Sequence, residues 1–392
     1  MPGYPDTRTD YPFDVILYPS IDTTSMVGYR TGVPISFPTF TEVERRKPNI
    51  IHTHCPMASI YMARNLRFVT GAPVVFTYHT KFDVDIENAV KLKFLRKPIL
   101  DAIVANIETC DEVWAVSRGA GENLKKLGFR GDYIVMPNGV DMPKGKIEQS
   151  KIDELSRRYS LSEDVPVYLF AGRLMWYKGI RIIIDALKKL DQKGLPFRMV
   201  FVGQGWDSEE ISNYVNECGI ADKVIFTGPI QNRDVLRAWY SRAQLFLFPS
   251  TFDTNGIVVR EAAACGLASV LIKDSCAAED IEDGDAGFLI EENADSMAQK
   301  LTELQAAPER MARVGENAMN KIYFSWEDSV AQAVKRYEVV IRRNSFMSPH
   351  KKHTVEDVSS NMQSNDGARR FMDEYRQGIA KLQEYYKSFK KK

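Results

Sequence analysis

The residues best suited to chemistry lie in the segment FPSTFDTNGIVVREAAACGLASV, residues 248–270. Two acids, Asp253 and Glu261, flank Asn255-Gly256 and directly follow an apolar run. This order predicts a strand, a turn of small residues and the start of a helix, where unpaired backbone N–H groups bind anions. We expect a phosphate at the turn, with both carboxylates accepting hydrogen bonds from sugar or ribose hydroxyls. A capped helix with a surface acid is the alternative interpretation.

A basic loop follows a second apolar run, VPVYLFA. Gly172 and Arg173 close this run, and Lys178-Gly179 lie just before the helical pattern RIIIDALKKL. Glycine allows the backbone to approach a ligand, while the arginine fork and the lysine point charge both bind phosphate oxygens. The combination predicts a diphosphate site, with an ordinary solvated loop as the alternative.

Two further apolar runs end in glycine, at Val202-Gly203-Gln204-Gly205 and Thr227-Gly228-Pro229-Ile230. Three successive predicted strands therefore end in glycine, and this set is more specific than a single GxG. Parallel strands bind ligands at their carboxyl ends. We expect Gly203 to border the same ligand and the backbone around Ile230 to contact a nucleotide base.

Histidines form a second group of candidates. His52 and His54 in IIHTHCP alternate onto one face of a predicted strand and Cys55 onto the other, which argues against a shared metal site. His79 follows the apolar run PVVFTY, so we expect it at the carboxyl edge of its sheet, facing a cleft; a histidine bound to a backbone carbonyl is the alternative. Asp83-Val84-Asp85 matches the DxD pattern of metal-binding sugar transferases, but on a helix the two acids would diverge. We expect no metal cofactor.

Composition limits the class of protein. The 392 residues suggest two domains, because a single core rarely grows beyond about 250 residues. The 52 basic and 52 acidic side chains cancel, so nothing favours a nucleic-acid partner. Five widely spaced cysteines indicate a reducing cytoplasm rather than a disulfide framework. Without a signal pattern or an apolar run of about 20 residues, we expect a protein either soluble in the cytoplasm or peripheral on the inner face of a membrane.

The chemistry-bearing segments are positioned by short apolar runs that alternate with helical patterns from Asn49 onward. This alternation predicts βαβ units, hence an α/β protein with two Rossmann-like, doubly wound domains facing a cleft. The predicted domains are 1–150, 151–343 and a tail at 344–392. The predicted strands of the second domain are 165–171, 197–203, 224–228, 245–249, 269–272 and 287–290.

Two basic segments suggest contact with a membrane surface. Residues 91–98, KLKFLRKP, interleave four basic residues with Phe94 and Leu95. The tail carries an apolar helical stripe between Phe371 and Phe389 in a net basic context. The alternatives are an exposed helix face for the first segment and packing on the first domain for the second.

In this order and spacing, GRLxxxKG, VGQG, GPI and D-x7-E resemble the second domain of the retaining family-four glycosyltransferases, and IIHTHCP, TYHT and PNGVD resemble their first domain. The resemblance implies the GT-B architecture, with an acceptor-side first domain and a nucleotide-sugar-binding second domain. It also implies transfer of a hexose from a nucleotide-sugar donor with retained configuration and without a metal. TYHT and the basic helix after it look most like bacterial enzymes that glycosylate membrane lipids such as diacylglycerol.

Carried over by resemblance, Arg173 and Lys178 would hold the donor diphosphate and stabilise the leaving group. Asp253 would contact hydroxyls of the transferred sugar, and His79 would lie beside the reacting carbon. No covalent nucleophile stands out, so same-face attack guided by the donor phosphate is expected. The remaining donor-binding residues implied by the resemblance are Gly172, Gly203, Ile230, Asn255, Gly256, Ile257 and Glu261.

The chain departs from the family pattern in two places. Asp253 stands where the family usually has Glu, which bears on donor identity. The opening residues contain only one plausible strand, Asp14 to Tyr18, and no glycine-rich turn, so we expect a first domain without its opening βα unit and a truncated start. A non-catalytic nucleotide-sugar-binding protein and a nucleotide-sugar epimerase therefore stay open as alternatives.

Overall fold

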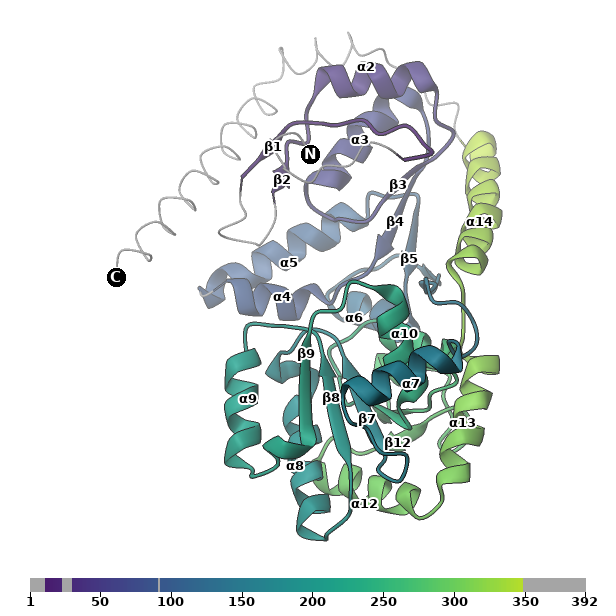
Figure 1. The fold of residues 1–392 in the computed structure, drawn as a ribbon. Coiled ribbons are helices and arrows are strands. Elements are labelled where there is room, and N and C mark those ends of the chain that lie inside the picture. Colours follow the sequence, from purple (N-terminus) through teal and green to yellow (C-terminus); the bar gives the residue numbers. More distant parts are fainter. Residues whose placement is uncertain (1–10, 23–29, 91, 348–392) are drawn as a thin grey trace. The chain divides into compact units, whose positions relative to one another are not determined.

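The computed structural model describes residues 11–22, 30–90 and 92–347 (Figure 1). Its contacts divide the chain into two compact units, each built on a parallel sheet. The first unit comprises 1–115, 121–134 and 333–392, and the second comprises 116–120 and 135–332.

These units differ from the predicted boundaries at 150 and 343. The segment after residue 135 belongs to the second unit because its backbone is bonded there: Gly145 N donates to Ala264 O at 2.7 Å, and Ile147 N donates to Ser241 Oγ at 3.1 Å. The carboxyl half of α14 (Trp326–Met347) belongs to the first unit. The predicted tail stripe between Phe371 and Phe389 lies outside the described residues.

The sheet of the first unit has the strand order β3-β4-β5-β6, and helices alternate with its strands as predicted. Register along β3 and β4 is parallel, with His52 opposite Val75, and β4 pairs with β5 so that Thr77 lies opposite Trp114. The strands are β3 (Ile51–Thr53), β4 (Val74–Tyr78), β5 (Glu112–Ala115) and β6 (Tyr133–Val135). The helices are α3 (Ala58–Thr70), α4 (Phe82–Ala89), α5 (Lys93–Ile107) and α6 (Arg118–Lys126).

The carboxyl half of α14 is fixed to this sheet by a buried carboxylate. Glu112, at the start of β5, accepts hydrogen bonds from Arg336 at 2.8 and 2.6 Å and lies 3.4 Å from Arg343. Burial acts to raise the pKa of Glu112, but these arginines and a hydrogen bond from Trp114 outweigh it and hold the pKa below its usual value. Tyr337 stacks on Trp114 with ring centroids 5.2 Å apart. Helix and sheet therefore share one polar and aromatic contact face.

The predicted strand at Asp14 to Tyr18 is wrong. The extended pair is instead β1 (Ser20–Ile21) with β2 (Thr31–Gly32), which run antiparallel. Polar contacts hold this strand pair together, a few residues after the predicted strand. Arg30 Nε donates to Ser20 Oγ at 2.9 Å, and Val33 N donates to Pro19 O at 2.8 Å.

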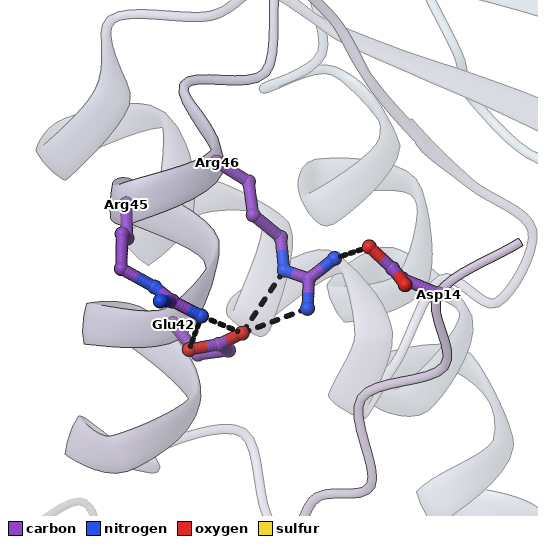
Figure 2. A network of polar contacts seen from close by, with 4 residues as sticks. All are labelled: Asp14, Glu42, Arg45 and Arg46. Atoms are coloured by element: carbon purple, nitrogen blue, oxygen red, sulfur yellow. Dashed lines mark hydrogen bonds and ion pairs between the residues drawn. The ribbon is translucent and has the colours of Figure 1, made fainter.

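Helix α2 (Phe37–Arg46) follows β2 and was not predicted. Figure 2 shows the polar network at its carboxyl-terminal half, where Glu42 accepts from Arg45 at 2.8 Å and from Arg46 at 2.7 Å, while Arg46 also contacts Asp14. These hydrogen bonds lower the pKa of Glu42. Because the network is exposed, its role is local: it holds the segment around Asp14 against α2.

The second unit contains a six-stranded sheet of order β12-β11-β10-β7-β8-β9 in which every pair is parallel. All six predicted strands of this domain are confirmed. The order runs outward in both directions from β7 and β10, which makes that pair the topological switch point of a doubly wound sheet. The strands are β7 (Val167–Ala171), β8 (Arg198–Val202), β9 (Val224–Gly228), β10 (Leu245–Phe248), β11 (Ser269–Ile272) and β12 (Phe288–Ile290).

Helices connect these strands, and β7, β8 and β9 are visible side by side in Figure 1. Strands β7, β10 and β11 are buried along their whole length, as near-continuous apolar runs predict for parallel strands. The connecting elements are α7 (Gln149–Arg158), η1 (Trp176–Lys178), α8 (Ile180–Gln192), α9 (Ser208–Glu217), η2 (Ala221–Lys223), α10 (Arg233–Arg242), α11 (Ile257–Ala264), η3 (Cys276–Ala278), α12 (Ala294–Gln305) and α13 (Pro308–Lys321).

All five cysteines are free thiols. Within the described ranges, no helix is long and apolar enough to cross a bilayer.

Candidate active site

The switch point of the second unit brings two predicted segments together. Because β7 and β10 are hydrogen-bonded neighbours, the loops at their carboxyl ends meet. Lys178, in the loop after β7, places its Nζ 2.5 Å from Oδ1 of Asp253, in the loop after β10. The Lys178 side chain is 8% exposed and that of Asp253 is 23% exposed. Two residues 75 positions apart in sequence thus form a largely buried ion pair.

The charge around this pair favours an anion. Burial lowers the pKa of Lys178, Asp253 acts to raise it, and repulsion from Arg173 lowers it further. Arg173 is exposed and makes no hydrogen bond or ion pair within the described part of the chain. Asp253 thus pairs with Lys178 alone, while the nearby Arg173 has no counter-charge in the described ranges, and a phosphate oxygen would supply the missing negative charge.

The loop after β10 has unused hydrogen-bonding capacity. Eight buried side-chain N or O atoms lack a hydrogen-bond partner among the described residues, and three of them belong to this loop: Ser250 Oγ, Asp253 Oδ2 and Asn255 Oδ1. Buried polar atoms are normally paired, so such a concentration needs an explanation. A polar ligand that reaches Asp253, the most exposed of the three residues, accounts for one of these atoms directly.

The start of α11 is shaped as predicted. Gly256 caps the helix with φ of 59°, and a Cβ there would lie 3.0 Å from that of Ala277. The Asn255 side chain turns away from solvent, since Nδ2 donates to Val116 O at 2.7 Å. Asn255 and Gly256 also line a cavity of about 40 Å³, while Ile257 is 39% exposed. The helix start therefore keeps an accessible side.

Glu261 lies on α11 and is 8% exposed. Tyr240 Oη donates to its Oε2 at 3.1 Å, and Arg233 Nη1 lies 3.2 Å from its Oε1. Burial, followed by the charge of Glu261, raises the pKa of Tyr240 well above its usual value. Both carboxylate oxygens are thus engaged, one of them by a half-exposed arginine that a ligand could displace. Sequence reasoning missed Arg233 and Tyr240, although Arg233 opens the helix just after the GPI loop.

Gly203 has a role in packing, and its contact with a ligand stays a prediction. Its φ is 132°, and a Cβ would lie 1.9 Å from Gly172 O, so only glycine allows the loops after β7 and β8 to pack together. Gly203 N also donates to Gly228 O at 3.0 Å, which joins the loop after β8 to the end of β9. Ile230 lies just beyond that end, partly buried against the core. The three glycine-ended strands therefore form one continuous edge.

His79 belongs to the first unit, where it directly follows β4 as predicted. His79 Nε2 lies 2.9 Å from His54 Nδ1, and the His54 and His52 rings are 4.2 Å apart between centroids. Burial, with a contribution from His54, lowers the pKa of His79 to about 4. His52 is affected more strongly, because burial and its two histidine neighbours lower its pKa to about 3. Burial also lowers the pKa of His54, so all three imidazoles are neutral at pH 7. Beyond strand alternation, no pattern in the sequence indicates the His54–His79 contact.

The DxD segment opens α4. Asp83 Oδ2 accepts from Asn123 Nδ2 at 3.0 Å, and Asn123 in turn accepts from Tyr78 Oη at 2.7 Å. This network ties α4 to β4, so Asp83 has a structural partner. Among the described residues, no cluster of three or more His, Cys, Asp or Glu side chains is arranged to hold a metal ion.

Solved structures with similar backbones define the class of protein. HepE of Anabaena, determined in complex with UDP and glucose, is 20% identical with a TM-score of 0.64, over 77% of this chain and 81% of that chain. Sucrose-phosphate synthase of Thermosynechococcus elongatus is 22% identical with a TM-score of 0.66, over 78% and 77%. Together with the doubly wound sheet, these similarities show a two-domain, Rossmann-like GT-B fold.

Sequence comparison then identifies the family. Residues 151–321 match the family described as "Glycosyl transferases group 1", and residues 2–143 match "Glycosyltransferase Family 4". The chain belongs to the family-four glycosyltransferases.

Two curated relatives illustrate the range of this family. The D-inositol 3-phosphate glycosyltransferase of Xylanimonas cellulosilytica is 28% identical over 250 residues, 60% of this chain. The alpha-monoglucosyldiacylglycerol synthase of Streptococcus pneumoniae is 24% identical over 226 residues, 56% of this chain. The chain spans 59% and 50% of the lengths of these relatives.

Proposed function

We propose that this glycosyltransferase moves a hexose from a nucleotide-sugar donor to a membrane lipid such as diacylglycerol, with retention of anomeric configuration and without a metal. The observation that carries the proposal is the switch-point site, where the buried Lys178 is paired with Asp253 and the charge of Arg173, unpaired among the residues that the structure describes, is close enough to lower the pKa of Lys178. A diphosphate is the anion that two adjacent cations suit best.

The site residues have distinct roles in this reaction. Arg173 and Lys178 bind the donor diphosphate and stabilise the negative charge that grows on it as the glycosidic bond breaks, which is most effective in a desolvated site. Asp253, with one oxygen held by Lys178 and the other unpaired, accepts a hydroxyl of the transferred sugar. Because its charge is already neutralised by Lys178, Asp253 is a poor covalent nucleophile, which supports same-face attack by the acceptor.

A surface on the first unit supports a lipid acceptor and peripheral binding at the inner face of a membrane. Leu92, Phe94 and Leu95, at the start of α5, are 49%, 73% and 39% exposed. Of the four basic residues predicted here, Lys91 lies outside the described residues and Lys93 is exposed, while Arg96 and Lys97 form ion pairs with nearby acids. The apolar side chains therefore contribute more to this surface than its charge. The pneumococcal relative is named for the synthesis of monoglucosyldiacylglycerol, and a diacylglycerol acceptor fits that name.

Transfer to vesicles tests the proposal. The protein is incubated with UDP-glucose or GDP-mannose and anionic vesicles that contain diacylglycerol, and the lipid extract is analysed for a glycolipid with its anomeric configuration. We expect a product with the configuration of the donor sugar. Isomerised donor without a glycolipid would indicate an epimerase, and donor binding without turnover would indicate a binding protein.

Charge introduced on the exposed apolar surface tests the acceptor side. Phe94→Glu should weaken vesicle binding, whereas Val330→Glu, a change at a 54% exposed position of the second unit, serves as the control. Equal vesicle binding by both variants would remove α5 from the acceptor surface.

A further inference from the structure

Three histidines of the first unit share one face of its sheet. His52 on β3 lies opposite Val75 on β4 in the parallel register. Because side chains alternate along a strand, His54 lies on the same face of the sheet as His52, and Thr77 and His79 lie on that face as well. His54 Nδ1 and His79 Nε2 approach to 2.9 Å, with ring centroids 5.1 Å apart. Both lie just beyond the carboxyl ends of their strands, the edge at which parallel sheets bind ligands.

His52 provides a rigid base for this contact. Its Nε2 lies 2.7 Å from Thr77 Oγ1 and its Nδ1 lies 2.5 Å from Tyr337 Oη, so both ring nitrogens have partners. Trp114 meets the same ring edge-on at 4.9 Å between centroids. The His54 ring lies over this immobilised imidazole at 4.2 Å. The orientation of the His54 ring is therefore set both by its stacking on His52 and by its contact with His79.

We propose that His54 is a positioning residue that fixes the tautomer and ring orientation of His79, an inference that rests on the proposed transferase function and on the expected place of His79 beside the reacting carbon. In a hydrogen bond between two neutral imidazoles, one nitrogen carries the proton and the other does not. The contact through Nε2 thus decides which atoms of His79 can face a substrate. His54 itself is exposed, so it forms this contact without being part of the core.

Two substitutions at His54 distinguish positioning from simple bulk. The amide of Asn reaches about as far as Nδ1 of histidine, whereas the amide of Gln reaches the place of Nε2. Because the contact uses Nδ1, His54→Asn should preserve it in either donor sense and His54→Gln should not.

The direct readout is ¹⁵N NMR of the histidine rings at pH 7, which is practical because the chain has five histidines. We expect His79 to show one tautomer in the wild type and in H54N, and a mixture in H54Q. A single unchanged His79 tautomer in H54Q would overturn the proposal. This measurement requires no substrate, so it gives a result even if the proposed transferase activity is absent.

Kinetics provide the second readout. Misplacement of a reacting group costs up to about 100-fold, so we expect kcat of H54Q to fall by roughly 10- to 100-fold while the Kd for the donor stays within about twofold. H54N should recover most of the rate. An unchanged kcat in H54Q, or an H54N variant as slow as H54Q, would contradict positioning through Nδ1. If the wild type shows no transfer, the proposed function fails, and the NMR measurement alone then tests whether His54 positions His79.

Discussion

The Lys178–Asp253 ion pair offers a detailed test of the site at the switch point. Asp253→Asn removes the carboxylate charge but keeps the shape, so Lys178 stays buried without a counter-charge. Breaking a buried pair in this way costs about 3–5 kcal/mol of unfolding free energy. Since the Asp253 side chain is 23% exposed, water can replace part of the lost solvation. We therefore expect a loss of about 3 kcal/mol, the lower end of that range.

A double-mutant cycle completes this test. Lys178→Met leaves the more exposed partner unpaired and should cost about 1–2 kcal/mol. The double variant contains neither buried charge, so it should lie within about 1 kcal/mol of the wild type. Urea unfolding at pH 7 measures all four proteins. Single-variant losses that add to within about 0.5 kcal/mol in the double variant would refute a coupled buried pair.

The same variants separate stability from ligand binding. A ligand at about 100 times its Kd that binds only the folded state stabilises it by about 2.7 kcal/mol. We expect UDP to stabilise the wild type and D253N in this way, because Lys178 is still present to meet the diphosphate. K178M should lose most of the effect. Equal stabilisation of K178M and the wild type would refute Lys178 as a diphosphate ligand.

Three further predictions concern the scaffold. Gly203→Ala would place Cβ 1.9 Å from Gly172 O and should lower the unfolding free energy by about 3 kcal/mol or more. The control is Gly194→Ala, also at positive φ but in open space, which should lower it by about 1 kcal/mol. Urea unfolding measures both. Glu112→Gln should cost about 3 kcal/mol, because it leaves two arginines without their shared carboxylate; an unchanged urea midpoint would contradict this. Burial lowers the pKa of His79 from 6.5 to about 4, so the unfolded state binds the extra proton and stability falls as pH drops through that window. At pH 5 this amounts to at most about 2 kcal/mol, and His79→Gln should flatten the pH dependence by that amount.

Sequence reasoning predicted the second unit well because parallel strands buried on both faces leave continuous apolar runs. The runs ending at Gly172, Gly203 and Gly228 mark strands whose positive-φ ends need glycine. The same reasoning failed at Asp14 to Tyr18. Apolar residues there suggest a strand, but the short antiparallel pair is set by contacts of Arg30 and Pro19 that no periodicity encodes.

The details of the site required the fold. Lys178 and Asp253 meet only because β10 lies beside β7 rather than beside β9, its predecessor in the chain. The contacts of Arg233 and Tyr240 with Glu261 likewise depend on how α10 packs near α11. Helical patterns indicate which face is apolar, but they do not indicate which polar end meets a distant carboxylate.

The central claim is that the switch point of the second unit binds the diphosphate of a nucleotide-sugar donor, and Arg173 tests it most directly. Arg173 is exposed, so Arg173→Ala should change the unfolding free energy by less than about 0.5 kcal/mol. Calorimetric titration with UDP should nevertheless show a Kd raised about 10- to 100-fold, the value of a charged hydrogen bond. Arg157→Ala, at an exposed arginine on α7 of the same unit, should leave the Kd unchanged. A Kd for R173A equal to that of the wild type would contradict the account.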